Sequence, residues 1–314
     1  MLPTFISTRR IGVYTLRLFT LIVVSISSIH ICEAQLWKRH RGEIYFGGGA
    51  SQMLGDLGGG TGVGQNSIAD LNLEATNFAF STGFKYRVTP EVTTRLGLSW
   101  ARVSGSDEFS QDNQGRRNRN LSVRTDIIEI SPMLEFYIIK DRLPLNLSLG
   151  RRYRRHGQGA SFSLYVATGF TMLYYNPQAL LGSTWHNLRP LSTEGQGIIP
   201  GSALYSEFSF ALPVGVGFKL NLTRDWSIGV EGQARFTATD YLDDVSTTYY
   251  DNQAIERARG PVAAELADRR LENSGGAGGI RGNPDNNDVY FMLQFNIVKR
   301  IQMMKRRRPV RRRF

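Results

Sequence analysis

The chain has 314 residues and a formal net charge of +11, but residues 299–314 hold nine basic residues and no acid, whereas residues 35–298 hold 26 of each sign. The high pI therefore belongs to a tail. In a cytosolic protein such a tail would suggest nucleic-acid binding, but the export signal at the start of this chain argues against that partner. The single cysteine, Cys32, excludes a fold held together by internal disulfides.

Residues 1–34 have the order of a secretory signal peptide. Three arginines precede a mostly apolar, uncharged stretch at 18–31, and Ala34 offers a small residue at a cleavage point. The apolar stretch is shorter than the ~20 residues that a membrane-spanning helix needs. Lipidation of Cys32 is the alternative, although Ile31 is larger than the residue that lipoprotein signals place there. We expect cleavage near Ala34 and export.

Beyond residue 34 the sequence alternates apolar and small or polar residues with the period of a two-faced strand. In one segment Phe78, Phe80 and Phe84 share a face, and Ala79 and Ser81 lie on the other. Each segment has roughly the 9–11 residues that a tilted strand needs to cross a bilayer. The eight segments are 43–50, 78–88, 92–101, 128–138, 161–172, 208–219, 226–236 and 289–297.

The second face of these segments is mainly Gly, Ala, Ser and Thr. A soluble sandwich or lipocalin-like barrel, the alternative, would carry many more charges there. We therefore predict an all-β fold over 35–298: an eight-stranded antiparallel transmembrane β-barrel in the outer membrane, with an N-terminal signal peptide and a basic periplasmic tail at 299–314. Pro132 and Pro213 lie inside strands, so a bulge or local irregularity is expected at each.

Long and short connections alternate, as in outer-membrane barrels with long outer loops and short periplasmic turns. The predicted outer loops are 51–75, 102–124, 175–206 and 238–287. The predicted periplasmic links are 89–91, 140–159 and 221–225.

Charged residues on the predicted inner face are nearly balanced in sign. Buried charges persist mainly when they are paired, so we predict a salt-bridged plug and no passive pore. Arg87 is expected at the periplasmic rim, within reach of water. The inner set is Lys85, Arg95, Glu129, Glu135, Lys219, Glu231 and Arg235.

Three stretches carry a family resemblance: Gly55-Asp56-Leu57, the run 191–197 with Tyr205-Ser206, and the run 239–250. Together they resemble the PorG-like outer-membrane proteins of the Bacteroidetes type IX secretion system. The resemblance implies a non-enzymatic accessory role in type IX protein transport, beside periplasmic secretion-ring proteins. The outer-loop motif that it marks comprises Asp240, Tyr241, Asp243 and Asp244.

Enzymatic and metal chemistry find little support in the sequence. His186 is the only histidine on a predicted outer loop, and no nucleophile motif accompanies it, so a hydrolase is the third choice. Asp240, Asp243, Asp244 and Asp251 are the best calcium candidates, but their spacing matches no EF-hand loop. We predict no cofactor, no metal and no catalytic residue.

Basic residues of the 140–159 link and the tail should meet at the periplasmic face, where we expect them to dock onto an acidic partner or the anionic headgroups of outer-membrane lipid. The alternative is a solvated tail that only keeps the chain soluble during export. For the whole protein, the alternative function is an adhesin-like barrel that binds through its outer loops. The docking candidates are Arg151, Arg152, Arg154, Arg155, Lys305, Arg306, Arg307, Arg308, Arg311, Arg312 and Arg313.

Overall fold

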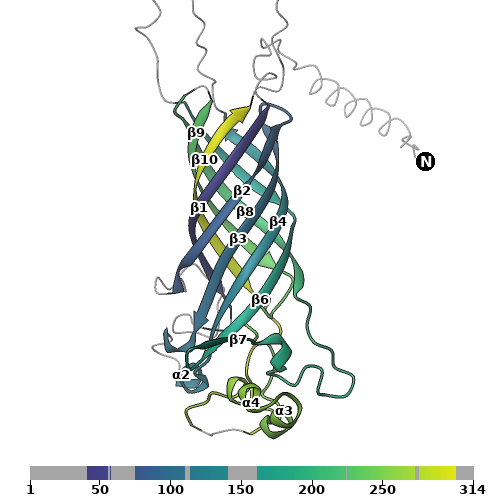
Figure 1. The fold of residues 1–314 in the computed structure, drawn as a ribbon. Helices are drawn as coiled ribbons and strands as arrows, with labels where there is room; N and C mark the ends of the chain where they lie inside the picture. The colour runs from purple at the N-terminus through teal and green to yellow at the C-terminus, as the bar shows by residue number, and fades with distance from the viewer. Residues whose placement is uncertain are drawn as a thin grey trace, which may run out of the picture. The chain divides into compact units, whose positions relative to one another are not determined.

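A computed structural model describes residues 41–55, 57, 75–109, 114–140, 161–223, 225–272 and 276–301, and these form a closed antiparallel barrel (Figure 1). The ring closes because β3 pairs with β4 as well as with β2. β5 and β6 follow one another along a single wall strand, so the ring has eight members. Its strands are β1 (Gly42–Leu54), β2 (Asn77–Arg87), β3 (Val92–Ser106), β4 (Ser122–Ile139), β5 (Ser161–Gly169), β6 (Thr171–Leu181), β8 (Phe208–Asn221), β9 (Trp226–Thr237) and β10 (Val289–Ile301).

All eight predicted strands are confirmed, and several run further than expected toward the long-loop end. β3 continues to Ser106, and β4 begins at Ser122, six residues before the expected start. This end also carries elements that the sequence did not predict (Figure 1). They are β7 (Thr184–Asn187), η4 (Asp107–Phe109), η6 (Arg189–Leu191), α2 (Gln114–Arg119), α3 (Asn252–Arg259) and α4 (Pro261–Ala267).

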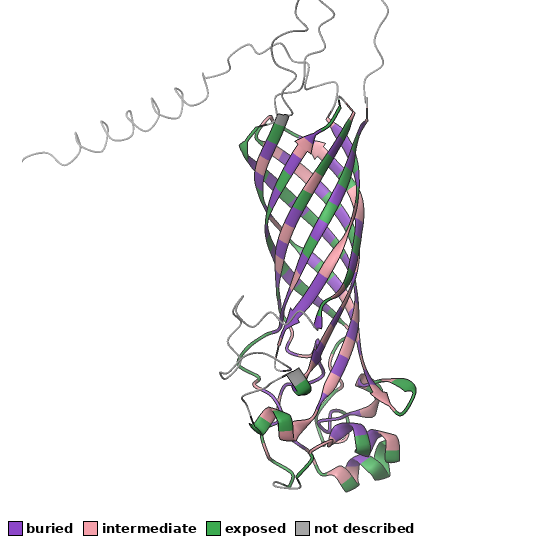
Figure 2. Ribbon diagram, turned by 90° about the vertical axis from the view of Figure 1, so that its left-hand side faces the viewer, coloured by how far each residue is buried: buried purple, intermediate pink, exposed green. Residues whose placement is uncertain are grey.

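The outer surface of the wall is apolar and exposed, while alternate residues are buried inside (Figure 2). Phe78 is 73% exposed and Phe295 66% exposed, beside Ala79 and Gln294 on the buried face. An apolar belt around a closed ring of strands is stable only against lipid. The predicted faces are therefore confirmed. None of the described helices is long and apolar enough to cross a membrane.

The two in-strand prolines flank one interruption of the wall. Phe170, between β5 and β6, lies opposite Pro132 and donates its backbone N–H to the Pro132 carbonyl at 3.0 Å. Pro213 lies on the other neighbouring strand at the same level, because Thr168 pairs with Val214 and Thr171 with Ala211. The expected irregularity takes the form of a gap in the ladder and not of a bulge, because the register continues unchanged through it.

Interior glycines make room for two buried tyrosines. A Cβ at Gly97 would lie 2.6 Å from the Tyr45 hydroxyl, and one at Gly217 would lie 2.2 Å from the Tyr165 ring. Small residues on the inner face therefore match large residues on strands nearby in the wall. A consequence is that Gly217, although it faces the interior, has no space for even a small side chain.

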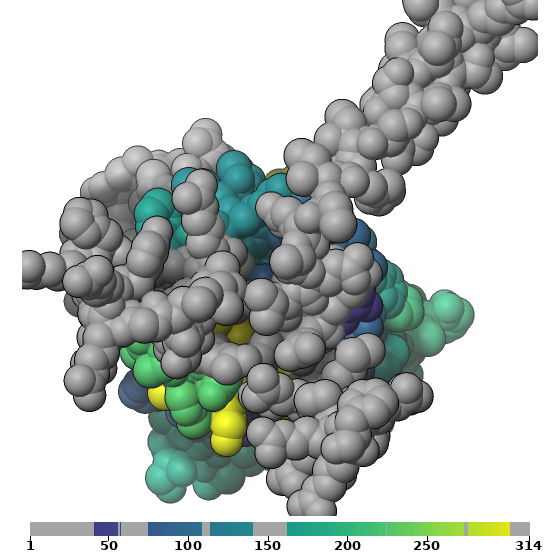
Figure 3. Space-filling view, turned by 90° about the horizontal axis from the view of Figure 1, so that it is seen from above, coloured from purple at the N-terminus to yellow at the C-terminus, as the bar shows by residue number. Residues whose placement is uncertain are grey.

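The short-turn end of the barrel is closed by tight turns built around threonine. Thr89 Oγ1 accepts the backbone N–H groups of Glu91 and Val92, and Thr223 Oγ1 accepts those of Asp225 and Trp226. In Figure 3 the end of β10, in yellow, lies beside the β8–β9 turn, in green. There Arg300 donates its backbone N–H to the Asp225 carbonyl at 2.7 Å.

The predicted start of the basic tail needs correction. β10 continues to Ile301, and Arg300 points into the barrel, where it is only 3% exposed. Arg87, expected within reach of water, is also buried at 6% exposed, with its guanidinium 5.5 Å from the centroid of the Tyr137 ring. Both arginines reach inward because the interior offers acidic or aromatic partners. The remainder of the predicted tail and the predicted signal peptide lie outside the described residues.

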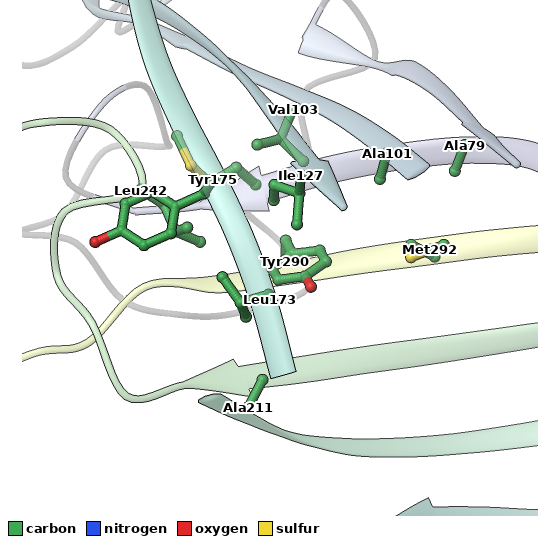
Figure 4. Close-up of a cluster of buried hydrophobic side chains, with 11 residues drawn as sticks. Ala79, Ala101, Val103, Ile127, Leu173, Tyr175, Ala211, Leu242, Tyr290 and Met292 are labelled. Atoms are coloured by element: carbon green, nitrogen blue, oxygen red, sulfur yellow. The ribbon is translucent and has the colours of Figure 1, made fainter. Parts of the chain in front are cut away.

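A cluster of buried apolar side chains lies inside the barrel toward the long-loop end (Figure 4). It combines wall residues such as Ile127 and Leu173 with Leu242, which comes from the loop after β9 and is fully buried. The loop thus closes the mouth of the barrel by inserting a side chain into it.

Candidate functional site: a charged lumen and an outer platform

Three of the buried ion pairs inside the barrel form a connected middle group. Arg95 Nη1 lies 2.7 Å from Glu231 Oε2 and 3.2 Å from Glu135 Oε1, and Lys85 Nζ lies 2.7 Å from the same Glu135 oxygen. Tyr165 adds a hydroxyl that donates to Glu231 at 2.8 Å. The carboxylates therefore share their cations across the lumen, from β2, β3, β4 and β9.

Further ion pairs lie on either side of this group. Arg235 Nε lies 3.2 Å from Glu129 Oε2 toward the long-loop end. Toward the short-turn end, Glu43 lies 3.2 Å from both Lys219 and Arg300. All seven predicted interior charges are in such pairs, so the predicted plug is confirmed. Glu43 and Arg300 were missed because they fall at the end of a weak first segment and in the presumed tail.

The long-loop end forms a folded platform, which we define as the described residues of 188–207 and 239–288. By the rule that outer loops are long, it lies on the outer side of the membrane. Its centre is Arg281, which is 2% exposed. Arg281 Nη1 lies 2.9 Å from Glu194 Oε1 and also donates to the Asp244 carbonyl, and Nη2 lies 3.7 Å from Asp244 Oδ2.

Glu194 ties the two platform loops together through backbone N–H groups and one hydroxyl. Its carboxylate accepts the N–H of Ser246 at 2.9 Å and the Thr247 hydroxyl at 2.7 Å. The N–H of Arg281 in turn bonds the Thr247 carbonyl at 2.9 Å. One glutamate and one arginine thus fix the paths of three chain segments far apart in the sequence.

Asp244, from the predicted motif, is fully buried at the same place. Tyr205 donates its hydroxyl to Oδ1 at 2.6 Å and Thr193 donates to Oδ2 at 2.5 Å. The residue has φ of +60°, a left-handed backbone that asparagine and aspartate tolerate better than most residues. Burial raises the pKa of its carboxyl from 3.8 to about 6, against the opposing charge of Arg281.

The other motif residues have separate structural partners. Tyr241 stacks on Tyr205 with ring centroids 4.5 Å apart, and Tyr205 stacks on Tyr175 at 6.3 Å. Asp243 accepts the N–H of Val245 at 3.0 Å. Asp240 is buried, with 7% of its surface exposed.

The candidate calcium ligands do not converge within the described residues. Asp251 instead accepts the N–H of Gln253 and caps α3. The described part of the chain holds no group of three or more His, Cys, Asp or Glu side chains arranged to bind a metal.

The three stretches that carry the family resemblance meet at this platform. A Cβ at Gly55 would lie 2.6 Å from an oxygen of Asp288 and 2.9 Å from one of Asp243, so any larger residue there would displace these carboxylates. Leu57 packs in one apolar cluster with Val245 and Leu188. The motifs therefore share a structural role, which is to hold the outer loops on the mouth of the barrel.

Arg281 is the main residue that sequence reasoning missed. It stands alone in a loop rich in Gly and Asn, and no spacing links it to Glu194 or Asp244. His186, the histidine considered for catalysis, lies on β7 and pairs with Ala179 on β6. The proposed basic docking residues at 151–155 and 305–313 lie outside the described residues.

Solved structures with a similar fold are outer-membrane barrels. The attachment invasion locus protein Ail of Yersinia pestis, solved with the heparin analogue sucrose octasulfate, is 9% identical, with 84% of this chain and 99% of that chain covered and a TM-score of 0.37. Neisserial surface protein A is 8% identical, with 83% and 97% covered and a TM-score of 0.36. OprG of Pseudomonas aeruginosa is 8% identical, with 83% and 97% covered and a TM-score of 0.35.

No curated protein matches the sequence. The lipid-facing belt and the closed ring of strands make this protein an outer-membrane β-barrel, as predicted. A family model described as a domain of unknown function, DUF6089, matches residues 16–259. That match includes the first seven wall strands and the motif residues of the platform, and the chain belongs to this family.

Proposed function

We propose that this protein is a non-enzymatic accessory component of type IX protein secretion, which anchors or docks the secretion machinery at the outer membrane. The observation that carries the proposal is the closed lumen. Ion pairs among residues at most 5% exposed fill the interior, and Leu242 closes the mouth. Secreted cargo has no path through such a barrel. The protein therefore acts through the surfaces at the two ends of the barrel.

The resemblance to PorG-like proteins supports the secretion role. Its motif residues hold the platform in one shape: Glu194 and Asp244 bind Arg281, and Gly55 fits against Asp243 and Asp288. A rigid surface suits docking, because a preordered surface loses less entropy on binding.

Periplasmic secretion-ring proteins are the proposed partners at the other end. The described part of that face includes Lys140, which lies 2.5 Å from Glu91 and is half exposed. We propose that the basic residues at 151–155 and 305–313 supply most of the contact with an acidic surface. Electrostatic docking of this kind should weaken as salt shortens the Debye length from about 10 Å at 0.1 M to about 3 Å at 1 M.

The second candidate is a surface-binding, adhesin-like barrel that acts through the outer platform alone. The folded platform favours it, because unstructured loops would suffice for a barrel that serves only as an anchor. The two functions differ in where the partner lies.

The test is crosslinking in the native membrane followed by identification of the captured proteins. Two variants separate the ends: deletion of 303–314, which leaves β10 intact, and Arg281→Met, which disrupts the platform. If the deletion reduces capture of periplasmic ring proteins and secretion of cargo, in a salt-dependent way, the secretion role is supported. If only Arg281→Met has an effect, and the captured partner is extracellular, the adhesin-like function replaces it.

A further inference from the structure

Rows of outward-facing side chains cross the wall where it leaves the lipid belt, on β3, β4 and β6 and on the neighbouring β7 and β8. The last lipid-facing row is aromatic and aliphatic, and its members pair directly across the strands: Trp100, Ile128, Tyr174 and Phe208. The next row is Arg102, Asp126 and Asn176, and the row beyond it is Ser104, Arg124, Gln178 and Asn187. The wall therefore changes from apolar to polar between one outward position and the next.

Arg102 is neutralised within the first polar row. Its Nε and Nη2 donate to the two Asp126 oxygens at 2.8 and 2.9 Å, and about a third of each side chain is exposed. The positive charge of the patch therefore rests on Arg124, in the second row.

Arg124 is held by Trp185 and Gln178, and its guanidinium has a further donor group. Its guanidinium lies 3.5 Å from the centroid of the Trp185 ring, and Nε and Nη2 both donate to Gln178 Oε1 at 3.1 Å. Gln178 is itself oriented, because its amide donates to Asn187 at 2.8 Å. Nη1 makes no hydrogen bond within the described part of the chain, and no described carboxylate lies within ion-pair distance of this guanidinium.

The geometry points to Arg124 as the centre of a binding site for a phosphate group of an outer-leaflet glycolipid, with Trp185 and Gln178 as the residues that position it. A guanidinium fork binds phosphate through two parallel hydrogen bonds, and stacking on an aromatic ring leaves its N–H edge open. The Trp185 ring and the Gln178 amide hold the Arg124 guanidinium in place before the lipid binds, which lowers the entropy lost on binding.

The height of Arg124 above the belt favours a glycolipid over a phospholipid. Successive outward positions are ~6.8 Å apart along a strand, and a wall strand tilts by about 40°. Arg124 therefore lies roughly 10 Å above the row of Trp100 and Tyr174. Aromatic residues at the belt edge sit at headgroup level themselves, so a phosphate at Arg124 has to belong to a headgroup that extends well beyond that level, as a phosphorylated sugar does.

Arg124 also attaches the β6–β7 hairpin to the wall through Trp185, and a purely structural role is the competing explanation. The two roles predict different behaviour. Attachment of the hairpin is indifferent to the lipid, whereas a phosphate site distinguishes a phosphorylated glycolipid from the same molecule without phosphate.

The experiment measures binding of bis-phosphorylated lipid A, and of the same lipid after dephosphorylation, to the full chain in detergent by native mass spectrometry. The parent protein should prefer the phosphorylated form by about tenfold. Arg124→Gln should remove most of this preference, while Arg117→Gln, the same change at an exposed arginine on α2, should leave it intact. A gel shift on heating confirms that each variant is folded.

Equal binding of the two lipids by the parent protein would overturn the proposal, and this comparison stands even if Arg124→Gln fails to fold. Retention of the preference by folded Arg124→Gln would also overturn it. A third arm uses phosphatidylglycerol. If it binds as tightly as phosphorylated lipid A, the site recognises anionic lipid in general and the glycolipid assignment is wrong.

Discussion

The lumen and the outer platform both bury charged side chains, but they hold them in different ways. In the lumen, Arg95, Glu135 and Glu231 project from neighbouring or facing strands whose register fixes their height. In the platform, Arg281 and Glu194 bind side chains and backbone groups alike, and they determine the path of the loops. The charges in the lumen pair inside a barrel that the strand ladders already define, whereas the charges in the platform hold the loops in their paths.

This difference suggests where each region is vulnerable. The barrel wall is stabilised by strand ladders and by lipid, so loss of one ion pair should weaken the barrel without changing its topology. The platform depends on a few buried polar contacts, so changes there should loosen the loops and leave the wall intact. Substitutions in the two regions can test this contrast.

The largest effect is expected for Arg95→Met in the lumen. The change leaves Glu231 without its arginine and Glu135 with Lys85 alone, and removing one partner of a buried pair costs about 3–5 kcal/mol. The measurement is the temperature at which the protein loses its fast-migrating folded form on a gel. Arg102→Met is the matched control, because its pair with Asp126 is about one-third exposed and worth about 1 kcal/mol or less. An equal fall in this temperature for the two variants would show that water reaches the charges of the lumen despite their burial.

The next effect concerns the lipid face. Val216 is 55% exposed and lies near the middle of β8, so Val216→Arg should cost about 2–4 kcal/mol and reduce the assembled fraction. Val216→Leu is the control and should assemble normally. Gly217→Ser is unsuitable as a tolerant comparison, because the Tyr165 ring occupies the space that a side chain would need. Normal assembly of the arginine variant would contradict the assigned lipid face.

The smallest effect is a pH dependence confined to the platform. Because the folded pKa of Asp244 is about 6, above the 3.8 of an ordinary aspartate, the folded platform binds more protons than the unfolded chain between these values. The stability that protonated Asp244 contributes to the platform is fully present below about pH 4 and is lost as pH rises through 6. The pKa values of Glu91 and Asp268 lie below their ordinary values of 4.5 and 3.8, so these two groups act below about pH 4.5 and not between pH 5 and pH 7.

Protease cleavage of the platform should therefore be slower at pH 5 than at pH 7 by an amount equivalent to about 1 kcal/mol. Asp244→Asn should remove most of the pH dependence, while the exposed Asp285→Asn should retain it. The heated-gel behaviour of the barrel should be unchanged between the two pH values. A pH dependence that persists in Asp244→Asn would assign it to another group.

The sequence by itself determined the wall. Alternation is a local property of each strand, so it was sufficient to predict eight strands, their lipid-facing residues and the seven charges that point inward, such as Lys85 and Arg235. The two in-strand prolines also predicted the gap beside Phe170. Proline has no N–H to donate, so it interrupts a ladder whichever strand it pairs with.

Only the tertiary structure decided what the motif residues do. Arg281 and Glu194 are 87 positions apart, and their contact depends on how two loops fold over the barrel mouth. The space at Gly217 depends on a tyrosine of another strand, and the burial of Arg300 depends on Glu43 at the other end of the chain. Strand periodicity repeats every two residues and is visible in a short window, whereas contacts between distant segments leave no local pattern to detect.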